Sequence, residues 1–397
     1  MTTQTADQGR ATSRELLTAA GAVLTSWIAR QNASTAAPDL GPAVLATLVA
    51  QNPVASIAQH RVSHDAMRAW LRGSVHCRGP ALHGGFAGVL AGMRLISSVH
   101  TDVTPAAERT AAALRTAKQH WRSSEVGFTD YDLVSGPAGA LLALTTGEPT
   151  PMARHLAELA ADPRLTGFRI GAHAGHPLLG WTQGAVITGL AHGVAGTLAA
   201  LSMVSDRQAP GTLPAIRNLA SWLYRHQEVD ELGVVSWRAR LPEPGSPALG
   251  VVRRQAWCYG NPGISWALWT AGCALRRAGF DEGRSLCDAA LAAIRTFCDA
   301  YDACRHLDTE RTGDALAICH GAAGILLVAD AFDRQASFSP AAVLRERLDG
   351  FLRERLPEIV RLGDTDQSLL SGATGVLAAL LTAAGADRGW LRWVALS

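Results

Sequence analysis

The stretch Gly193-Val-Ala-Gly196-Thr-Leu-Ala199 decides the fold, because five other segments repeat its two glycines, three residues apart, followed by apolar residues. The first glycines of successive segments are 51 to 67 residues apart. Self-similarity at such a period is typical of repeat architectures, and each repeat has room for two helices. The other segments are Gly85-Phe-Ala-Gly88-Val-Leu-Ala91, Gly136-Pro-Ala-Gly139-Ala-Leu-Leu142, Gly260-Asn-Pro-Gly263-Ile-Ser-Trp266, Gly321-Ala-Ala-Gly324-Ile-Leu-Leu327 and Gly372-Ala-Thr-Gly375-Val-Leu-Ala378.

The sequence between and within these segments predicts helices of two kinds. Stretches 106–121, 213–226 and 341–356 place apolar residues at three- and four-residue steps, as amphipathic helices do. The glycine segments are apolar on nearly every face, which indicates helices buried on all sides. Strand patterns are scarce. We therefore predict an all-α fold, an α/α toroid of six to seven pairs of inner and outer helices, with residues 13–30 supplying part of a seventh pair.

Composition limits the classes of partner. The 397 residues are 48% hydrophobic and 18% charged with a net charge of +2, which favours a compact protein without a nucleic-acid partner. No apolar run has the length of a membrane span, and no signal peptide is visible. Seven cysteines suit reduced thiols better than a disulfide framework. We expect a flexible tail at 1–14, a single toroid domain at 15–397, and a cytoplasmic location, peripheral to the membrane only through a biosynthetic complex.

Three repeats carry reactive side chains beside the first glycine: Leu190-Ala-His-Gly193, Trp257-Cys-Tyr-Gly260 and Ile318-Cys-His-Gly321. If the repeats superpose, these side chains gather at one end of the ring. Cysteine and histidine are the preferred ligands of zinc, and three protein ligands leave a fourth position for substrate. Helix N-termini also lower the pKa of a cysteine. The register therefore predicts a catalytic zinc site at Cys258, Cys319 and His320.

The same motifs carry a resemblance to a known family. Trp257-Cys-Tyr-Gly-Asn-Pro-Gly263, Cys319-His-Gly321 and Leu190-Ala-His-Gly193, set within the glycine repeat, resemble the signatures of the lanthionine synthetase C-like family over roughly residues 80 to 380. This resemblance implies an α/α toroid and a Zn²⁺ held by Cys258, Cys319 and His320. It also implies His192 as an acid or base, and roles for Asp132 and Arg254.

The resemblance further implies a reaction and its partners. Members of the family add a peptide cysteine thiol to a dehydroalanine or dehydrobutyrine of the same peptide, which forms a thioether ring. The expected partner is a dehydrated precursor peptide with its leader, together with a complex of lanthipeptide dehydratase and exporter. Two alternatives stay open: a relative that adds glutathione to dehydrated residues, and a non-catalytic peptide-binding scaffold with a structural zinc. Glycosidase or terpene-cyclase toroids leave the Cys-His-Gly motif unexplained.

Each candidate also has a structural interpretation. Asp132 is as well suited to capping the helix after Ser135-Gly136 as to catalysis. Without the resemblance, Arg254 would be interpreted as a charged residue on the protein surface. His83 opens the first repeat in a position similar to His192, but capping or packing is the simpler expectation. The long loops 163–180 and 238–250 are expected to line or cover a substrate groove, with His173 and His176 exposed. Among the other cysteines, Cys298 and Cys304 with His306 are not expected to form a second metal site.

Overall fold

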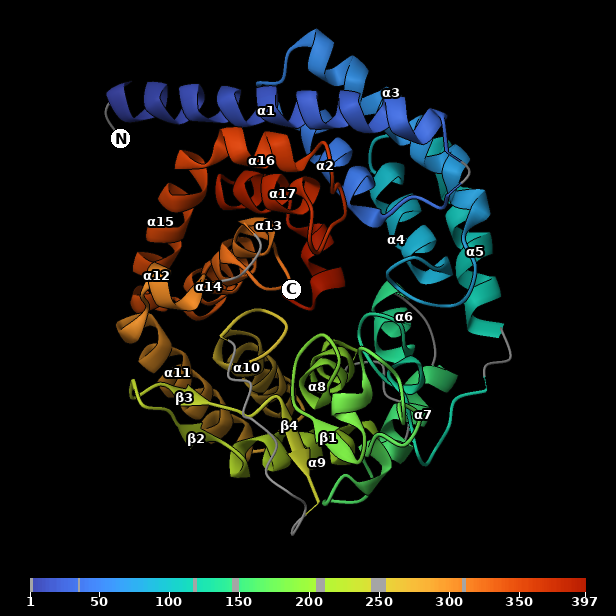
Figure 1. Ribbon diagram of the computed structural model, residues 1–397, viewed down its shortest axis with the longest axis vertical. Helices are drawn as coiled ribbons and strands as arrows, with labels where there is room; N and C mark the ends of the chain where they lie inside the picture. The colour runs from blue at the N-terminus through green and yellow to red at the C-terminus, as the bar shows by residue number, and fades with distance from the viewer. Residues whose placement is uncertain are drawn as a thin grey trace.

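The computed structural model describes residues 3–34, 36–116, 120–144, 150–204, 211–243, 255–308 and 312–397. These residues form seven inner helices in a ring, each covered by an outer helix (Figure 1). The prediction of an all-α toroid is confirmed. The inner helices are α2 (Leu40–Ala50), α4 (Phe86–Ser97), α6 (Pro137–Ala143), α8 (Val194–Met203), α10 (Asn261–Arg277), α14 (Ala322–Ala336) and α17 (Ala373–Ala383). The outer helices are α3 (Ile57–Gly73), α5 (Thr104–Thr116), α7 (Pro151–Leu159), α9 (Thr212–Arg225), α11 (Glu282–Ala300), α15 (Ser339–Glu354) and α1 (Thr3–Asn32).

The ring closes between the first and last helices of the described chain. Inner helix α17 packs against α2, and α1 packs over α17, α2 and α3. The seventh pair therefore joins an inner helix near the C-terminus to an outer helix near the N-terminus, which confirms that residues 13–30 belong to it. Helix α1 begins at Thr3, within the segment expected to be a tail. The division into a flexible tail, 1–14, and one domain, 15–397, stays a prediction.

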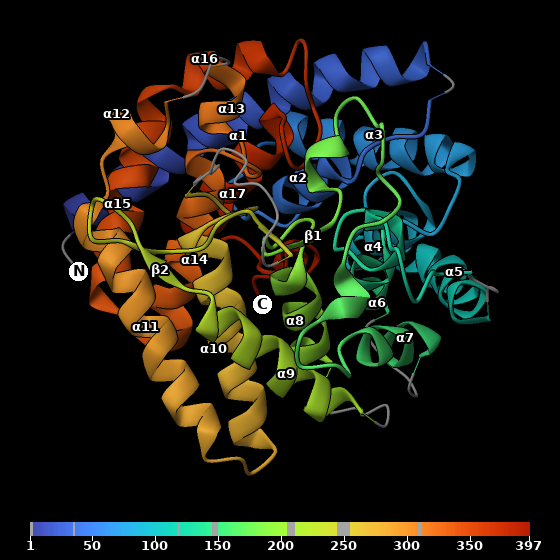
Figure 2. The same cartoon turned by 60° about the horizontal axis from the view of Figure 1, so that its bottom comes forward.

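Short elements occupy the connections between the long helices. Strand β1 (Ala185–Ile187) pairs antiparallel with β4 (Arg240–Pro242), and β2 (Glu228–Val229) pairs antiparallel with β3 (Val235–Ser236). Both pairs lie outside the glycine segments (Figure 2). The remaining helices are α12 (Ala303–His306), α13 (Thr312–Leu316), α16 (Leu356–Leu362) and the 3₁₀ helices at Ser74–His76, Thr101–Val103, Phe128–Asp130, Thr166–Phe168, Gly180–Thr182 and Gly389–Val394.

The two glycines of each repeat have distinct structural roles. The first is the N-cap of an inner helix in all six repeats. A Cβ on the second glycine would lie 1.8 to 2.2 Å from the carbonyl oxygen of the residue three before the first glycine. Only glycine permits this approach of the turn to the helix. The second glycines are Gly88, Gly139, Gly196, Gly263, Gly324 and Gly375.

Hydrogen bonds between backbone groups join the turns that precede the inner helices. In four cases the N–H of the residue two before the first glycine donates to the carbonyl of the equivalent residue in the next turn. These bonds hold the turns in one register around the ring, so side chains at equivalent positions share one level. They run from His83 to Val134 (3.1 Å), Ala191 to Cys258 (3.3 Å), Cys258 to Cys319 (3.3 Å) and Cys319 to Leu370 (2.8 Å).

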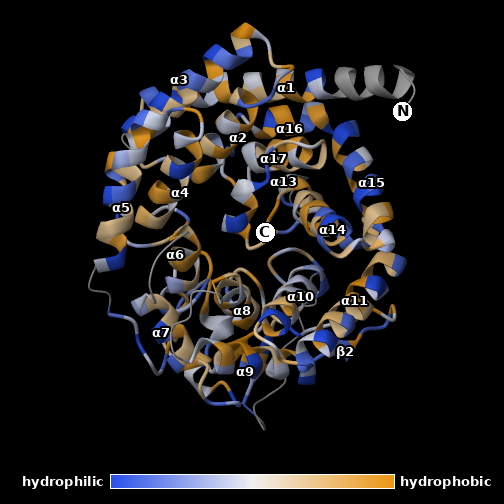
Figure 3. Cartoon of the chain, turned by 180° about the vertical axis from the view of Figure 1, so that it is seen from behind, coloured by the Kyte–Doolittle hydropathy of each residue, from blue (hydrophilic) through white to orange (hydrophobic). Residues whose placement is uncertain are grey.

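The core lies around the inner helices. Nearly every residue of α2, α6, α8 and α17 is buried, and the outer helices alternate hydrophobic and hydrophilic residues (Figure 3). The segment near the C-terminus is also buried, and its carbonyl groups at Val394 and Ala395 accept hydrogen bonds of 2.8 Å from the indoles of Trp257 and Trp266. Among the described residues, no helix combines the length and apolar character that a membrane crossing requires.

Candidate functional site

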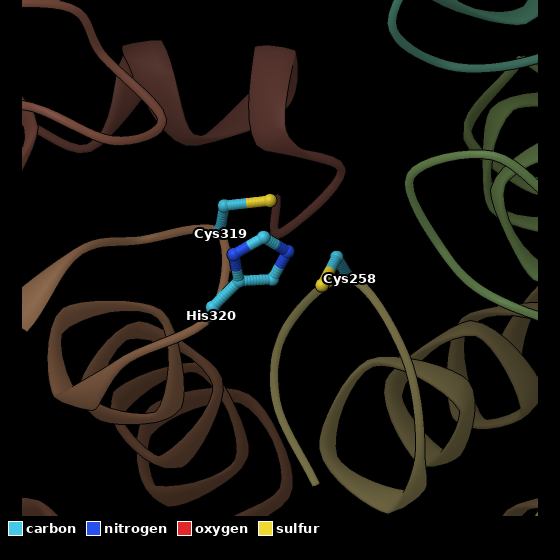
Figure 4. Close-up of side chains that lie close together, drawn as sticks. All are labelled: Cys258, Cys319 and His320. Atoms are coloured by element: carbon cyan, nitrogen blue, oxygen red, sulfur yellow. The ribbon is translucent and has the colours of Figure 1, made fainter. Parts of the chain in front are cut away.

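Three side chains from two neighbouring turns converge at one end of the ring. The ligand atoms of Cys258, Cys319 and His320 all lie within 4.8 Å of one another (Figure 4). Ligand atoms around a tetrahedral zinc are roughly 3.5 to 4 Å apart, given bond lengths of about 2.0 to 2.3 Å. In the part of the chain that the structure describes, this is the only group of three or more Cys, His, Asp or Glu side chains so placed.

The turns themselves place these ligands. Cys258 lies two residues before Gly260, whose φ of 87° is in the left-handed region that favours glycine. Cys319 and His320 directly precede Gly321, the N-cap of α14. The hydrogen bond from the Cys258 N–H to the Cys319 carbonyl joins the two turns. The clustering of these three side chains therefore follows from the repeat register and needs no further loop.

The electrostatics of the cluster favour a thiolate. The Cys258 thiol is hydrogen-bonded to Cys319, and the His320 ring contributes a second hydrogen bond and a favourable charge. Together they hold the pKa of Cys319 well below its ordinary value, although burial acts in the opposite direction. Two sulfur ligands and one imidazole, with a thiolate already favoured, are the donor set that zinc selects.

A histidine–aspartate pair comes from two other turns. His192 Nδ1 and Asp132 Oδ2 are 2.5 Å apart, and Asp132 is fully buried. The other carboxylate oxygen of Asp132 accepts hydrogen bonds from the N–H groups of Ser135 (2.7 Å) and Gly136 (2.8 Å). One oxygen of Asp132 therefore holds the turn before α6, and the other orients His192.

The His192 ring has a fixed orientation and one accessible edge. It stacks on Phe128 with ring centroids 4.5 Å apart and an interplanar angle of 19°, and the Tyr131 hydroxyl donates to its carbonyl at 2.9 Å. Burial opposes protonation, but the hydrogen bond and charge of Asp132 outweigh it and raise the pKa of His192. Its side chain is 32% exposed, and Nε2 has no hydrogen-bond partner among the described residues.

The pair and the ligand cluster belong to one site. The N–H of Leu190, two residues before His192, donates to the Cys258 carbonyl at 2.8 Å. The charge of Cys319 also acts on His192. Gly189 makes this junction possible, because a Cβ there would lie 2.5 Å from the Cys258 carbonyl oxygen and 2.6 Å from the Tyr259 ring. The arrangement places a polarised imidazole beside a cluster of two thiols and a second imidazole.

Among the described residues, no other candidate from the sequence belongs to the ligand cluster. Arg254 lies outside the described residues. His173 is buried, not exposed, since its ring hydrogen-bonds the Thr182 hydroxyl at 2.8 Å and packs edge-on against Phe128. His83 is in the register of Cys258 and Cys319, and Gly84 occupies the position that corresponds to His192. Cys298, Cys304 and His306 form no ligand cluster within the described ranges.

Sequence reasoning missed several aromatic residues of the site. Phe128 and Tyr131 hold His192, and Trp181, 39% exposed, lies edge-on to Tyr259 with ring centroids 6.4 Å apart. The proximity of Phe128 and Tyr131 to Asp132 was the available signal. No sequence signal links Trp181 to Tyr259, because 78 residues and two strand pairings separate them.

Comparisons with known proteins place this geometry in context. The family model described as lanthionine synthetase C-like protein matches residues 64–392. The solved structure of nisin cyclase is similar in fold, with a TM-score of 0.76 and 18% sequence identity, over 94% of this chain and 96% of that chain. A comparison with the sequences of curated proteins finds no match.

Proposed function

Because this chain belongs to the lanthionine synthetase C-like family, we propose that it closes thioether rings in a dehydrated precursor peptide. The reaction adds a cysteine thiol to a dehydroalanine or dehydrobutyrine of the same peptide, which yields lanthionine or methyllanthionine. The observation that carries the proposal is the pairing of two features at one end of the ring. They are the cluster of Cys258, Cys319 and His320, and the buried Asp132–His192 pair beside it.

The ligand cluster fits zinc by donor type and spacing. Cys258, Cys319 and His320 would hold the ion and leave one position for substrate. When bound, zinc supplies a positive charge that lowers the pKa of a coordinated thiol, which is otherwise about 8.5. Three protein ligands also favour an enzyme over a scaffold, because structural zinc sites normally have four.

Proton transfer is assigned to His192. Ring closure removes the thiol proton, forms a C–S bond at the β-carbon, and leaves an enolate that takes a proton at the α-carbon. Asp132 fixes Nδ1 and raises the pKa of His192, which favours a proton on Nε2 for release to the α-carbon. Phe128 keeps the ring in position through its stacking contact. The proton lost by the thiol restores the imidazolium, so the reaction is balanced.

Other roles follow from the family resemblance. Arg254 is proposed to stabilise the enolate oxygen, although it lies outside the described residues. The precursor peptide, with its leader, is the proposed substrate, and a dehydratase and an exporter are the proposed partners. The proposed location is the cytoplasm, where such a complex brings the protein to the membrane.

The test compares two reactions in one assay, ring closure and the addition of glutathione. A model peptide with one dehydroalanine and one cysteine is incubated with the zinc-loaded protein, and free thiols are counted by alkylation, because cyclisation leaves the mass unchanged. A second peptide with alanine in place of cysteine is offered with glutathione. We expect loss of the thiol in the first peptide, above the uncatalysed rate, and little adduct in the second. A dominant glutathione adduct, or binding of peptide without any reaction, contradicts the proposal.

A further inference from the structure

His83 is an unusual residue for a protein interior. Both ring nitrogens are buried, and neither has a hydrogen-bond partner among the described residues. Buried polar groups are nearly always hydrogen-bonded, so an exception needs an explanation. The backbone N–H of His83 is satisfied, because it donates a hydrogen bond to the Val134 carbonyl at 3.1 Å. The groups of His83 that lack hydrogen bonds among the described residues are therefore its two ring nitrogens.

The ring register places His83 at the level of the ligand cluster. It lies two residues before Gly85, the N-cap of α4, as Cys258 and Cys319 lie two residues before their own N-cap glycines. The charges of Cys319, Asp132 and His192 all act on the His83 ring. The imidazole thus belongs to the same end of the toroid, on the far side of the His192 turn from the ligands.

His83 has neither of the two simplest roles. Within the described residues, the ligand cluster consists of Cys258, Cys319 and His320 and does not include it. A structural histidine would hold a partner through at least one nitrogen, and this ring has no hydrogen-bond partner in the part of the chain that the structure describes. Burial lowers the pKa of His83 against smaller opposing effects of Asp39, Cys319 and Asp132, which favours the neutral ring with its one N–H donor.

We propose that the His83 imidazole N–H binds the carbonyl oxygen of the dehydrated residue and stabilises the enolate formed there. This inference rests on the proposed cyclisation. When the thiolate attacks the β-carbon, the C–S bond forms and the double-bond electrons move to the α-carbon and carbonyl oxygen. The hydrogen bond from His83 strengthens as that oxygen gains charge, and His192 supplies the α-carbon proton. His83 gains and loses no proton, so the balance of the reaction is unchanged.

The alternative in which His83 only fills space makes the same prediction about stability and a different one about activity, which it leaves unchanged on substitution. An unsatisfied buried imidazole destabilises the fold, because its desolvation is not compensated. Replacing it by an apolar side chain removes that penalty. A residue kept for catalysis therefore shows opposite effects on substitution, with activity falling while the melting temperature holds or rises.

The experiment uses His83→Leu and His83→Asn in the zinc-loaded full chain with the model peptide of one dehydroalanine and one cysteine. A donor that acts on a developing oxyanion contributes about 10²- to 10³-fold to kcat. We expect kcat for His83→Leu to fall by that factor, with zinc content unchanged and the melting temperature equal or higher. His83→Asn retains an N–H donor and should recover part of the rate. If His83→Leu does not fold, the rate and zinc content of His83→Asn are compared with those of the wild-type protein instead.

Tyr301→Phe is the matched control, because the Tyr301 hydroxyl is another buried group without a partner among the described residues. It is the C-cap of outer helix α11 and belongs neither to the ligand cluster nor to the Asp132–His192 pair, so the variant should keep full activity. Three results overturn the inference: a normal rate in His83→Leu, a loss of zinc, or a clear drop in melting temperature that accounts for the lost rate. A wild-type protein that does not cyclise the peptide overturns the proposed function itself, and this inference with it.

Discussion

The turns before α10 and α14 and the turns before α6 and α17 share the same pair of glycines and differ in two side chains. The first two carry Cys258-Tyr259 and Cys319-His320, and the other two carry Val134-Ser135 and Leu370-Ser371. All four end in an N-cap glycine and place a second glycine against the preceding turn. The comparison teaches that the glycine repeat fixes where each turn lies, whereas the two residues directly before the N-cap glycine determine which reactive side chains the turn presents. Function is therefore separable from fold by single substitutions.

The largest effect is expected at the first of these positions. Cys319→Ala removes one of three ligands, and we expect the zinc content to fall from about one ion per chain to nearly none, with cyclisation lost. Leu370→Val changes the equivalent position of the next turn and should leave zinc content unchanged. Elemental analysis of both purified variants makes the measurement. Full zinc in Cys319→Ala would show that the cluster is not the metal site.

The second position separates proton transfer from metal binding. His192→Ala should keep its zinc and its fold while the cyclisation rate falls by about 10²- to 10⁴-fold, the usual effect of losing a general acid or base. Ser371→Ala, at the equivalent position before α17, should have normal activity. Rates come from free-thiol counts on the model peptide, and zinc is measured in the same samples. Loss of zinc from His192→Ala would make His192 a ligand.

A glycine substitution tests the shared backbone. A Cβ at Gly139 would lie 2.0 Å from the Leu133 carbonyl oxygen, so Gly139→Ala should reduce the free energy of unfolding by about 1–3 kcal/mol. A Cβ at Gly350 in outer helix α15 would meet no atom within 4 Å, and Gly350→Ala should raise stability by about 0.4–1 kcal/mol. Thermal or denaturant unfolding measures both. Equal effects at the two glycines would refute the packing role.

The smallest effect concerns pH. The pKa of His192 is raised in the folded protein, so the pair stabilises the fold fully below the unfolded value near 6.5 and loses that contribution as pH rises through the folded value. In Asp132→Asn this pH-dependent part, roughly 1 kcal/mol for a charged hydrogen bond at a partly exposed ring, should disappear. The hydrogen bonds to the N–H groups of Ser135 and Gly136 remain, because the amide oxygen still accepts them. Unfolding free energies between pH 5 and 9 test it, and an unchanged profile contradicts the assignment.

The sequence predicted the parts of the molecule that the glycine repeat controls. The six inner helices, and the convergence of Cys258, Cys319 and His320, follow from register alone. Helix α2 was missed because it begins at Asp39-Leu-Gly41 and has no Gly-x-x-Gly segment. The position of His83 was misassigned because the double glycine, Gly84-Gly85, allows two alignments. The burial of His173 depends on contacts with Phe128 and Thr182, which local sequence does not encode.

Removal and return of the metal tests the central claim most directly. The wild-type protein is treated with a chelator, dialysed, and assayed on the dehydroalanine–cysteine peptide before and after addition of one equivalent of zinc. We predict that ring closure stops when zinc leaves and returns with it, while circular dichroism shows the toroid folded throughout. Ring closure at the same rate in the metal-free, folded protein would contradict the account.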